Sequence, residues 1–142
     1  MLKTLTLVCG ALAVSATVAL AAPQKKPPKS GAGCRPQVSV ILHGTVATAP
    51  GNAATLPSTL MVNVKHANFF GHAYLNATQP VAIKVDTGTH IRLGVMTGLT
   101  ALHAVAQKDR VKVEARVCKA DLAKNATPGL SATLVVAHKP AS

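Results

Sequence analysis

The segment RVKVEARVC, residues 110–118, alternates strictly between apolar and charged side chains. The apolar or small residues occupy the odd-numbered positions 111–117, and the charged residues occupy the even-numbered positions 110–116. The apolar set is Val111, Val113, Ala115 and Val117, and the charged set is Arg110, Lys112, Glu114 and Arg116. Because successive side chains of a β-strand point to opposite faces, this pattern predicts a strand with one face in a hydrophobic core and the other in solvent.

The same alternation recurs elsewhere in the chain and predicts further strands. These segments are 38–46, 59–66, 81–86 with a short extension at 90–93, and 130–138. Residues 97–106 instead place Leu99, Leu102 and Ala106 at helical spacing, with Thr97 or Thr100 as the N-cap, and predict one short helix. Three strands, a helix and two strands is the order of an OB-type barrel. The prediction is therefore an all-β, five-stranded, OB-like closed barrel over residues 37–139.

The N-terminal residues have the composition of an export signal. An uncharged apolar run extends from Leu5 to Leu20, and Ala19 and Ala21 are the small residues that a signal peptidase requires. We expect cleavage after Ala21 and a secreted or periplasmic protein, with residues 22–36 as a basic linker rich in Pro, Lys and Gly. The apolar run is shorter than a membrane-spanning helix, so no transmembrane segment is expected in the mature chain.

Two cysteines remain once Cys9 has left with the signal. Cys34 lies just before the first predicted strand, and Cys118 ends the fourth. In an OB-type barrel these two strands are antiparallel neighbours, so the start of one lies beside the end of the other. An even pair of cysteines in an exported protein also favours a bond. The sequence therefore predicts a Cys34–Cys118 disulfide.

Several short motifs resemble those of a family of bacterial exported domains of unknown function. They are Gly44-Thr45-Val46, the segment from Val81 to Ile91 with Asp86 and Thr89, the segment from Asp109 to Val113, and the segment from Leu130 to Val135. The resemblance covers most of residues 38–138 and implies an OB-like small β-barrel of unassigned function. Related exported barrels are associated with envelope stress and ligand binding. The chain departs from the family pattern at Lys108, where the pattern has glycine.

The charge balance favours an anionic partner. The chain has 15 Lys and Arg residues against 4 acids, a net charge of +11. Such a field attracts anionic lipid, wall polymers, acidic glycans or nucleic acid. The scarcity of aromatic residues disfavours a nucleic-acid partner, because bases bind by stacking on such rings. The candidate anion-binding residues are Arg110, Lys112, Arg116 and Lys119, and the alternative is that they form an ordinary solvated strand face.

A second candidate site follows the second predicted strand. All three aromatic residues fall within residues 69–74, between two histidines. The candidate ligand lip consists of His66, Phe69, Phe70, His72 and Tyr74. OB-type barrels commonly bind ligands through this region. The alternative is that the rings close one end of a core that has few large side chains.

Two alternative functions concern particular motifs. Asp86-Thr87-Gly88 is the motif of aspartic peptidases, which pair two aspartates, so a chain of this length would have to dimerise. An ordinary turn also explains these residues. His66 and His72 suggest a periplasmic metal-binding protein, although their spacing matches no recurrent zinc motif. The pattern as a whole favours a non-enzymatic binding protein without a cofactor.

Overall fold

The computed structural model describes residues 34–140. The predicted signal and most of the predicted linker lie outside these residues. The described strands are β1 (Gln37–Thr48), β2 (Ser58–Ala67), β3 (Val81–Val85), β4 (His90–Leu93), β5 (Met96–Thr97), β6 (Arg110–Cys118) and β7 (Leu130–His138). The helices are α1 (Gly98–Ala104) and two 3₁₀ segments, η1 (Phe69–Leu75) and η2 (Lys119–Asn125). None of the helices within 34–140 is long and apolar enough to cross a membrane.

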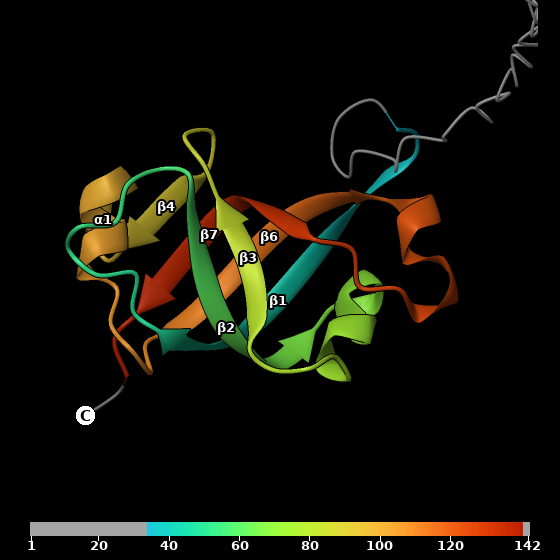
Figure 1. Cartoon of the computed structure of the whole chain (residues 1–142), viewed down its shortest axis with the longest axis horizontal. Coiled ribbons are helices and arrows are strands. Elements are labelled where there is room, and N and C mark those ends of the chain that lie inside the picture. The colour runs from blue at the N-terminus through green and yellow to red at the C-terminus, as the bar shows by residue number, and fades with distance from the viewer. Residues whose placement is uncertain (1–33, 141–142) are drawn as a thin grey trace, which may run out of the picture.

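The strands form one sheet in the order β3-β2-β1-β6-β7-β4-β5, and β3 also pairs with β7. This extra parallel pairing joins Ile83 to Leu130 and Lys84 to Ser131, and it closes a ring of five strands (Figure 1). β4 continues along β7 where β3 ends, so β3 and β4 together act as one interrupted barrel strand. The predicted all-β, OB-like closed barrel is confirmed, with the helix between its third and fourth strands.

The core is formed by the residues that the alternating pattern assigns to the inner face. Val113 and Val117 of β6 are 1% and 0% exposed, and Val40 of β1 and Leu60 of β2 are equally buried. Burying each such side chain contributes about 1.5–3 kcal/mol to folding. The polar residues at the alternate positions remain on the outside of the barrel, where the candidate sites must lie.

The helix buries a different face from the predicted one. Leu99 is 40% exposed, and the buried residues are Ala101, Leu102 and Val105. The expected face needed two full turns, but the helix ends at Ala104, and Val105 already has extended backbone angles. Thr97 occupies the N-cap position, but its side chain makes no capping hydrogen bond. The prediction of one short helix is thus confirmed, as is the burial of Leu102, and the predicted burial of Leu99 and Ala106 is wrong.

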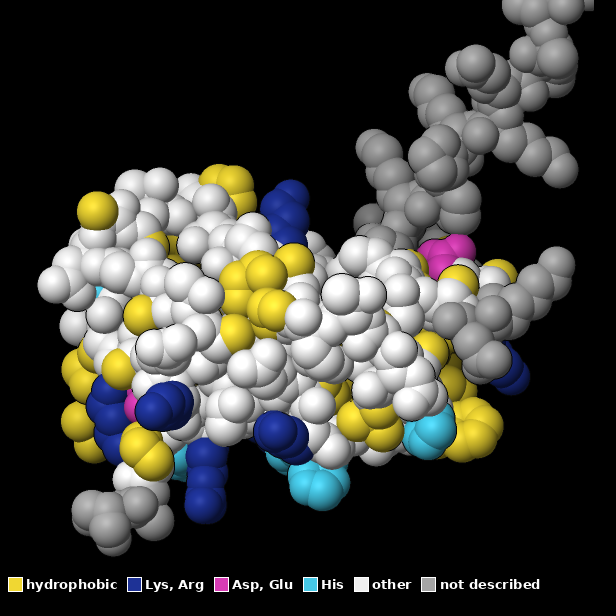
Figure 2. Space-filling view, turned by 60° about the horizontal axis from the view of Figure 1, so that its bottom comes forward, with side chains coloured by type: hydrophobic (Ala, Val, Ile, Leu, Met, Phe, Trp, Pro, Cys, Tyr) yellow, Lys and Arg dark blue, Asp and Glu magenta, His cyan; other side chains and the backbone are white. Residues whose placement is uncertain are grey.

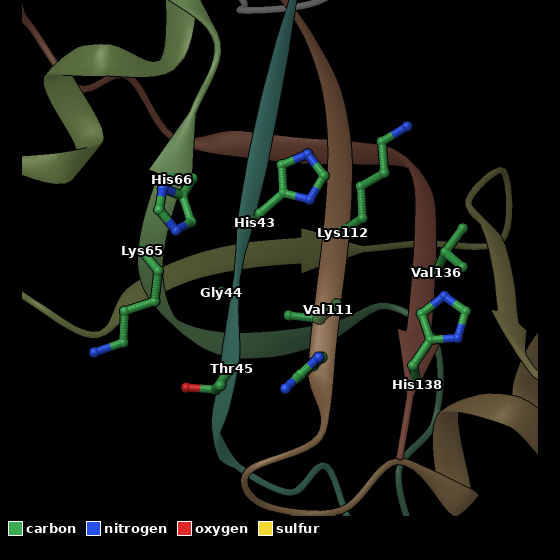
Figure 3. Close-up of a pocket in the computed structure, with 10 residues that line it drawn as sticks. His43, Gly44, Thr45, Lys65, His66, Val111, Lys112, Val136 and His138 are labelled. Carbon is green, nitrogen blue, oxygen red and sulfur yellow. The ribbon is translucent and has the colours of Figure 1, made fainter. Parts of the chain in front are cut away.

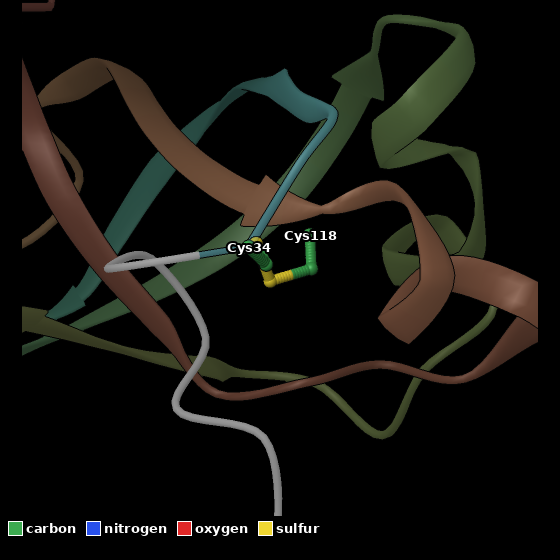
Figure 4. The surroundings of a disulfide bond; sticks show 2 residues. All are labelled: Cys34 and Cys118. Carbon is green, nitrogen blue, oxygen red and sulfur yellow. A yellow bond between two sulfur atoms is a disulfide. The ribbon is translucent and has the colours of Figure 1, made fainter.

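The predicted disulfide joins Cys34 to Cys118, whose Cα atoms are 5.7 Å apart (Figure 4). The bond lies at the end of the β1–β6 ladder, where Gln37 pairs with Cys118. The backbone N–H of Lys119 also donates to the Pro36 carbonyl, so the ladder continues up to the disulfide. The covalent link therefore joins two chain segments that strand pairing already holds together, as expected from the sequence.

Removing either cysteine should have the same effect on stability. We expect Cys34→Ser and Cys118→Ser each to lower the free energy of unfolding by about 4 kcal/mol, because either change opens a loop of 84 residues. Thermal denaturation of both variants and of the double variant measures this. Large but unequal losses would contradict the common origin of the two effects.

Lys108 lies in the turn before β6, and its φ angle is +72°. Side chains other than glycine are disfavoured in this left-handed region because Cβ crowds the backbone. The conformation is held from both sides. The Lys108 N–H donates to the Val46 carbonyl, and the next N–H, from Asp109, donates to Ala106.

We expect Lys108→Gly to raise the free energy of unfolding by about 0.5–1 kcal/mol, because glycine relieves this crowding at some cost in chain entropy. Urea denaturation measures the change. The matched control is Ala106→Gly, two residues earlier, where φ is not positive. This variant should lower the free energy of unfolding by about 0.5–1 kcal/mol. A loss of stability in Lys108→Gly would show that the lysine side chain, and not the backbone angle, determines the fit here.

Candidate anion-binding face

Basic side chains from four adjacent strands gather on the outside of the barrel. β1 lies between β2 and β6, and β7 follows β6. Strand pairing places His43 opposite His66 on one side and opposite Lys112 on the other (Figure 3). Two residues away along β6 from Lys112, Arg110 pairs with Thr45 of β1 and with His138 of β7. We define the basic face as His43, Lys65, His66, Arg110, Lys112 and His138.

A β-bulge in β2 places two consecutive residues on this face. His43 pairs with His66, but the next residue of β1, Gly44, pairs with Val64, so Lys65 is the extra residue. A bulge interrupts the alternation and redirects the side chains on either side of it. Both Lys65 and His66 are exposed. Without the bulge, the pattern of Val62 and Val64 would turn His66 toward the core.

The basic face surrounds a hollow of about 670 Å³. Gly44, Thr45, Val111 and Val136 complete its lining. At Gly44, an added Cβ would collide with the backbone carbonyl of Asn63, so only glycine allows the two strands to approach this closely. The lining of the hollow therefore combines a close approach of two strand backbones at Gly44 with the longer side chains of the basic face.

The charges of the basic face are only partly neutralised. Lys112 forms an ion pair with Glu114 at 2.7 Å, and both side chains are partly exposed. Within the described residues, Lys65 and Arg110 form no ion pair. Asp109 lies next to Arg110 in sequence, but it is 1% exposed and pairs with Lys139 at 3.0 Å. Figure 2 shows Lys, Arg and His side chains gathered along the lower edge of the molecule.

The predicted anion-binding residues divide between this face and its surroundings. Arg110 and Lys112 line the hollow. Arg116 is exposed further along β6, beyond Glu114, and pairs with Ser39. Lys119 is exposed on η2, past the disulfide. The structure thus brings two of the four candidates together with residues that were not predicted as anion ligands.

Three of these residues, His43, Lys65 and His138, were missed as candidates. The alternating pattern already predicts that His43 and Lys65 point outward, but it does not predict that they lie together. Which outward residues become neighbours depends on the register between strands. His138 ends β7 and joins the face only because it pairs with Arg110.

The predicted ligand lip does not form one surface. His66 belongs to the basic face, whereas His72 lines a separate hollow beside Asn76 and Thr127. Phe69 is 88% exposed and packs edge-on against Phe70, with 5.3 Å between ring centroids. Phe70 is itself partly buried against the core. Asn68 is the N-cap of η1, and its side chain accepts a hydrogen bond from the Gly71 N–H.

Tyr74 belongs to the core and not to a lip. Its side chain is 2% exposed, and its hydroxyl donates to the backbone carbonyl of Pro128. Burial raises the pKa of this phenol, because the charged phenolate is poorly solvated there. Tyr74 therefore anchors η1 to the loop before β7.

The Asp86-Thr87-Gly88 motif forms a hydrogen-bonded turn between β3 and β4. The Asp86 carboxylate accepts a hydrogen bond from the Gly88 N–H at 2.9 Å. The Thr89 hydroxyl accepts from the Asp86 N–H and donates to the Ala132 carbonyl at 2.8 Å. These bonds hold the turn against β7, so the motif has a clear structural role. Separately, the described part of the chain contains no group of three or more His, Cys, Asp or Glu placed to hold a metal ion.

Comparison with known proteins does not assign the chain to a family: no family model, curated protein or solved structure matches it. The resemblance to bacterial exported domains therefore stays a prediction from its motifs.

The burial of Tyr74 predicts its titration behaviour. The chain has one Tyr and no Trp, so phenolate absorbance reports on Tyr74 alone. Because its folded pKa is raised, the stability it contributes is complete below about pH 10 and is lost as pH rises above that value. We expect phenolate absorbance in the native protein to appear only well above pH 10, and together with unfolding.

In urea, the same absorbance should appear near the ordinary value of about 10. Tyr74→Phe should lose about 1 kcal/mol of stability with the hydrogen bond to Pro128, and it should also lose this part of the alkaline instability. A native protein whose phenol titrates near pH 10 without unfolding would place Tyr74 on the surface.

Proposed function

We propose that this protein is an exported, non-enzymatic β-barrel that binds an anionic polymer of the cell envelope or extracellular space through its basic face. One observation carries the proposal. Strand register places six basic or imidazole side chains from four neighbouring strands around one hollow, with Glu114 as the nearby acid. The signal pattern and the disulfide support export.

The geometry of the face favours a ligand with repeating charges. Neighbouring strands are about 4.8 Å apart, and residues two positions apart along a strand are about 6.6 Å apart. His66, His43 and Lys112 form one row across the strands, and Arg110 and His138 form a second row beside it. Each exposed charge contributes about 1 kcal/mol or less to binding, so a monovalent anion would bind weakly. A polymer that engages both rows adds these contributions together.

The chemistry of the hollow favours acidic glycans and wall polymers over nucleic acid. Its lining contains no Phe, Tyr or Trp, whose rings are the usual platforms for stacked bases. The cations can still pair with phosphate, sulfate or carboxylate groups along a chain. Asp86 supports a binding role over peptidase activity, because its carboxylate is engaged in its own turn.

The test removes the permanent charges of the face. We expect the triple variant Lys65→Gln, Arg110→Gln, Lys112→Gln to bind dextran sulfate about 100-fold more weakly than wild type, since each lost cation costs about 1 kcal/mol near a polyanion. The slope of log affinity against log salt concentration should also become shallower, because fewer counterions are released. Calorimetric titration at several salt concentrations measures both quantities.

A matched control separates the face from net charge. The variant Arg35→Gln, Lys84→Gln, Arg92→Gln removes the same charge from exposed positions outside the hollow. It should keep affinity within a few-fold of wild type, and melting curves should show that both variants are folded. Equal losses in the two variants would mean that overall charge, and not the basic face, attracts the polymer. No binding by wild type would refute the proposed function.

A further inference from the structure

Half of the basic face consists of histidine. The chain has 6 histidines, and strand pairing brings His43, His66 and His138 onto this face. All three are exposed. The other three lie elsewhere, with His72 on η1 and His90 on β4, while His103 on α1 makes a 2.7 Å hydrogen bond with the Ala54 carbonyl through its Nε2.

The groups that surround the three histidines are mainly cations. Lys65 lies beside them on β2, and Arg110 and Lys112 lie on β6. β7 contributes the apolar Val136 beside His138. The acid on this side of β6 is Glu114, which is paired with Lys112.

Two further charged groups lie at the edge of this set. Lys139 follows His138 in sequence, and Lys139 is paired with the buried Asp109. The carboxylates near the face are thus engaged by lysines. A positive charge gained by a histidine here is therefore available to a ligand.

Imidazole is the side chain that ordinarily gains its charge between about pH 5 and 8. Protonation of the three histidines would raise the number of cationic side chains on the face from three to six. The added charges lie within the two existing rows, so the same polymer can reach them.

We propose that the basic face is an acid-strengthened binding site for polyanions, with His43, His66 and His138 as the groups that respond to pH. This inference rests on the proposed function and adds regulation to it. The three permanent cations hold the polymer weakly by themselves, and each histidine that gains a proton adds a further cation to the same face. By linkage, a site that binds more tightly when protonated must also take up protons when it binds.

The experiment uses dextran sulfate as the probe, because sulfate esters keep their charge across this pH range and any pH dependence then belongs to the protein. We expect the affinity to rise on the order of 10- to 100-fold between about pH 8 and about pH 5.5 at constant salt, given the gain of three charges. The salt slope should steepen over the same range. Titrations near pH 6.5 in buffers with different ionisation enthalpies should show proton uptake on binding.

The variants identify the responsible histidines. The variant His43→Gln, His66→Gln, His138→Gln should lose the rise in affinity between about pH 8 and about pH 5.5, as a ratio to its own affinity at about pH 8, and it should also lose the proton uptake. The matched control, His72→Gln with His90→Gln, changes exposed histidines outside the face and should keep both. Single histidine variants, each tested for folding by melting curves, should lose intermediate parts of the response.

The outcomes separate the two proposals. Binding of equal strength at both pH values would overturn the acid-strengthened site and leave the proposed function standing. An acid response that survives in the triple histidine variant would assign the response to other groups and would also overturn the inference. Absence of binding at every pH would refute the proposed function itself.

Discussion

The pairing of β1 with two neighbours at once is the constraint on which the rest of this structure depends. β1 pairs with β2 on one side and with β6 on the other, and Gly44 lies where the β2 backbone comes too close for a side chain. The Cys34–Cys118 bond fixes the far end of the β1–β6 ladder. The inner face of these strands forms the core, and the outer face carries the candidate site. A shift of one residue in the register would exchange the two faces.

Much of the fold could be predicted from local pattern, because alternation reports burial directly. The charged and apolar positions of residues 110–118 fall on opposite faces as expected, and the strand order placed the two cysteines side by side. The helix face could not be predicted equally well. The helix ends at Ala104, two residues before Ala106, and Leu99 at its start is 40% exposed.

The candidate site was only partly predictable, because it depends on which strands are neighbours and where one strand bulges. Arg110 and Lys112 were predicted from charge alternation alone. His66 and Lys65 share a face because of a bulge that has no clear signature in the sequence, and His138 joins them through its pairing with Arg110. In the predicted ligand lip, closeness in sequence did not mean a shared surface, because Tyr74 is buried in the core whereas Phe69 is exposed.

The central claim is that anions bind on this outer face of the barrel. The most direct measurement is nuclear magnetic resonance of the isotope-labelled wild-type protein during titration with dextran sulfate. Binding at this site predicts chemical-shift changes concentrated at the six residues of the basic face and at Gly44 and Thr45 between them. Changes concentrated instead around Phe69 and His72, or spread evenly over all exposed lysines and arginines, would contradict it.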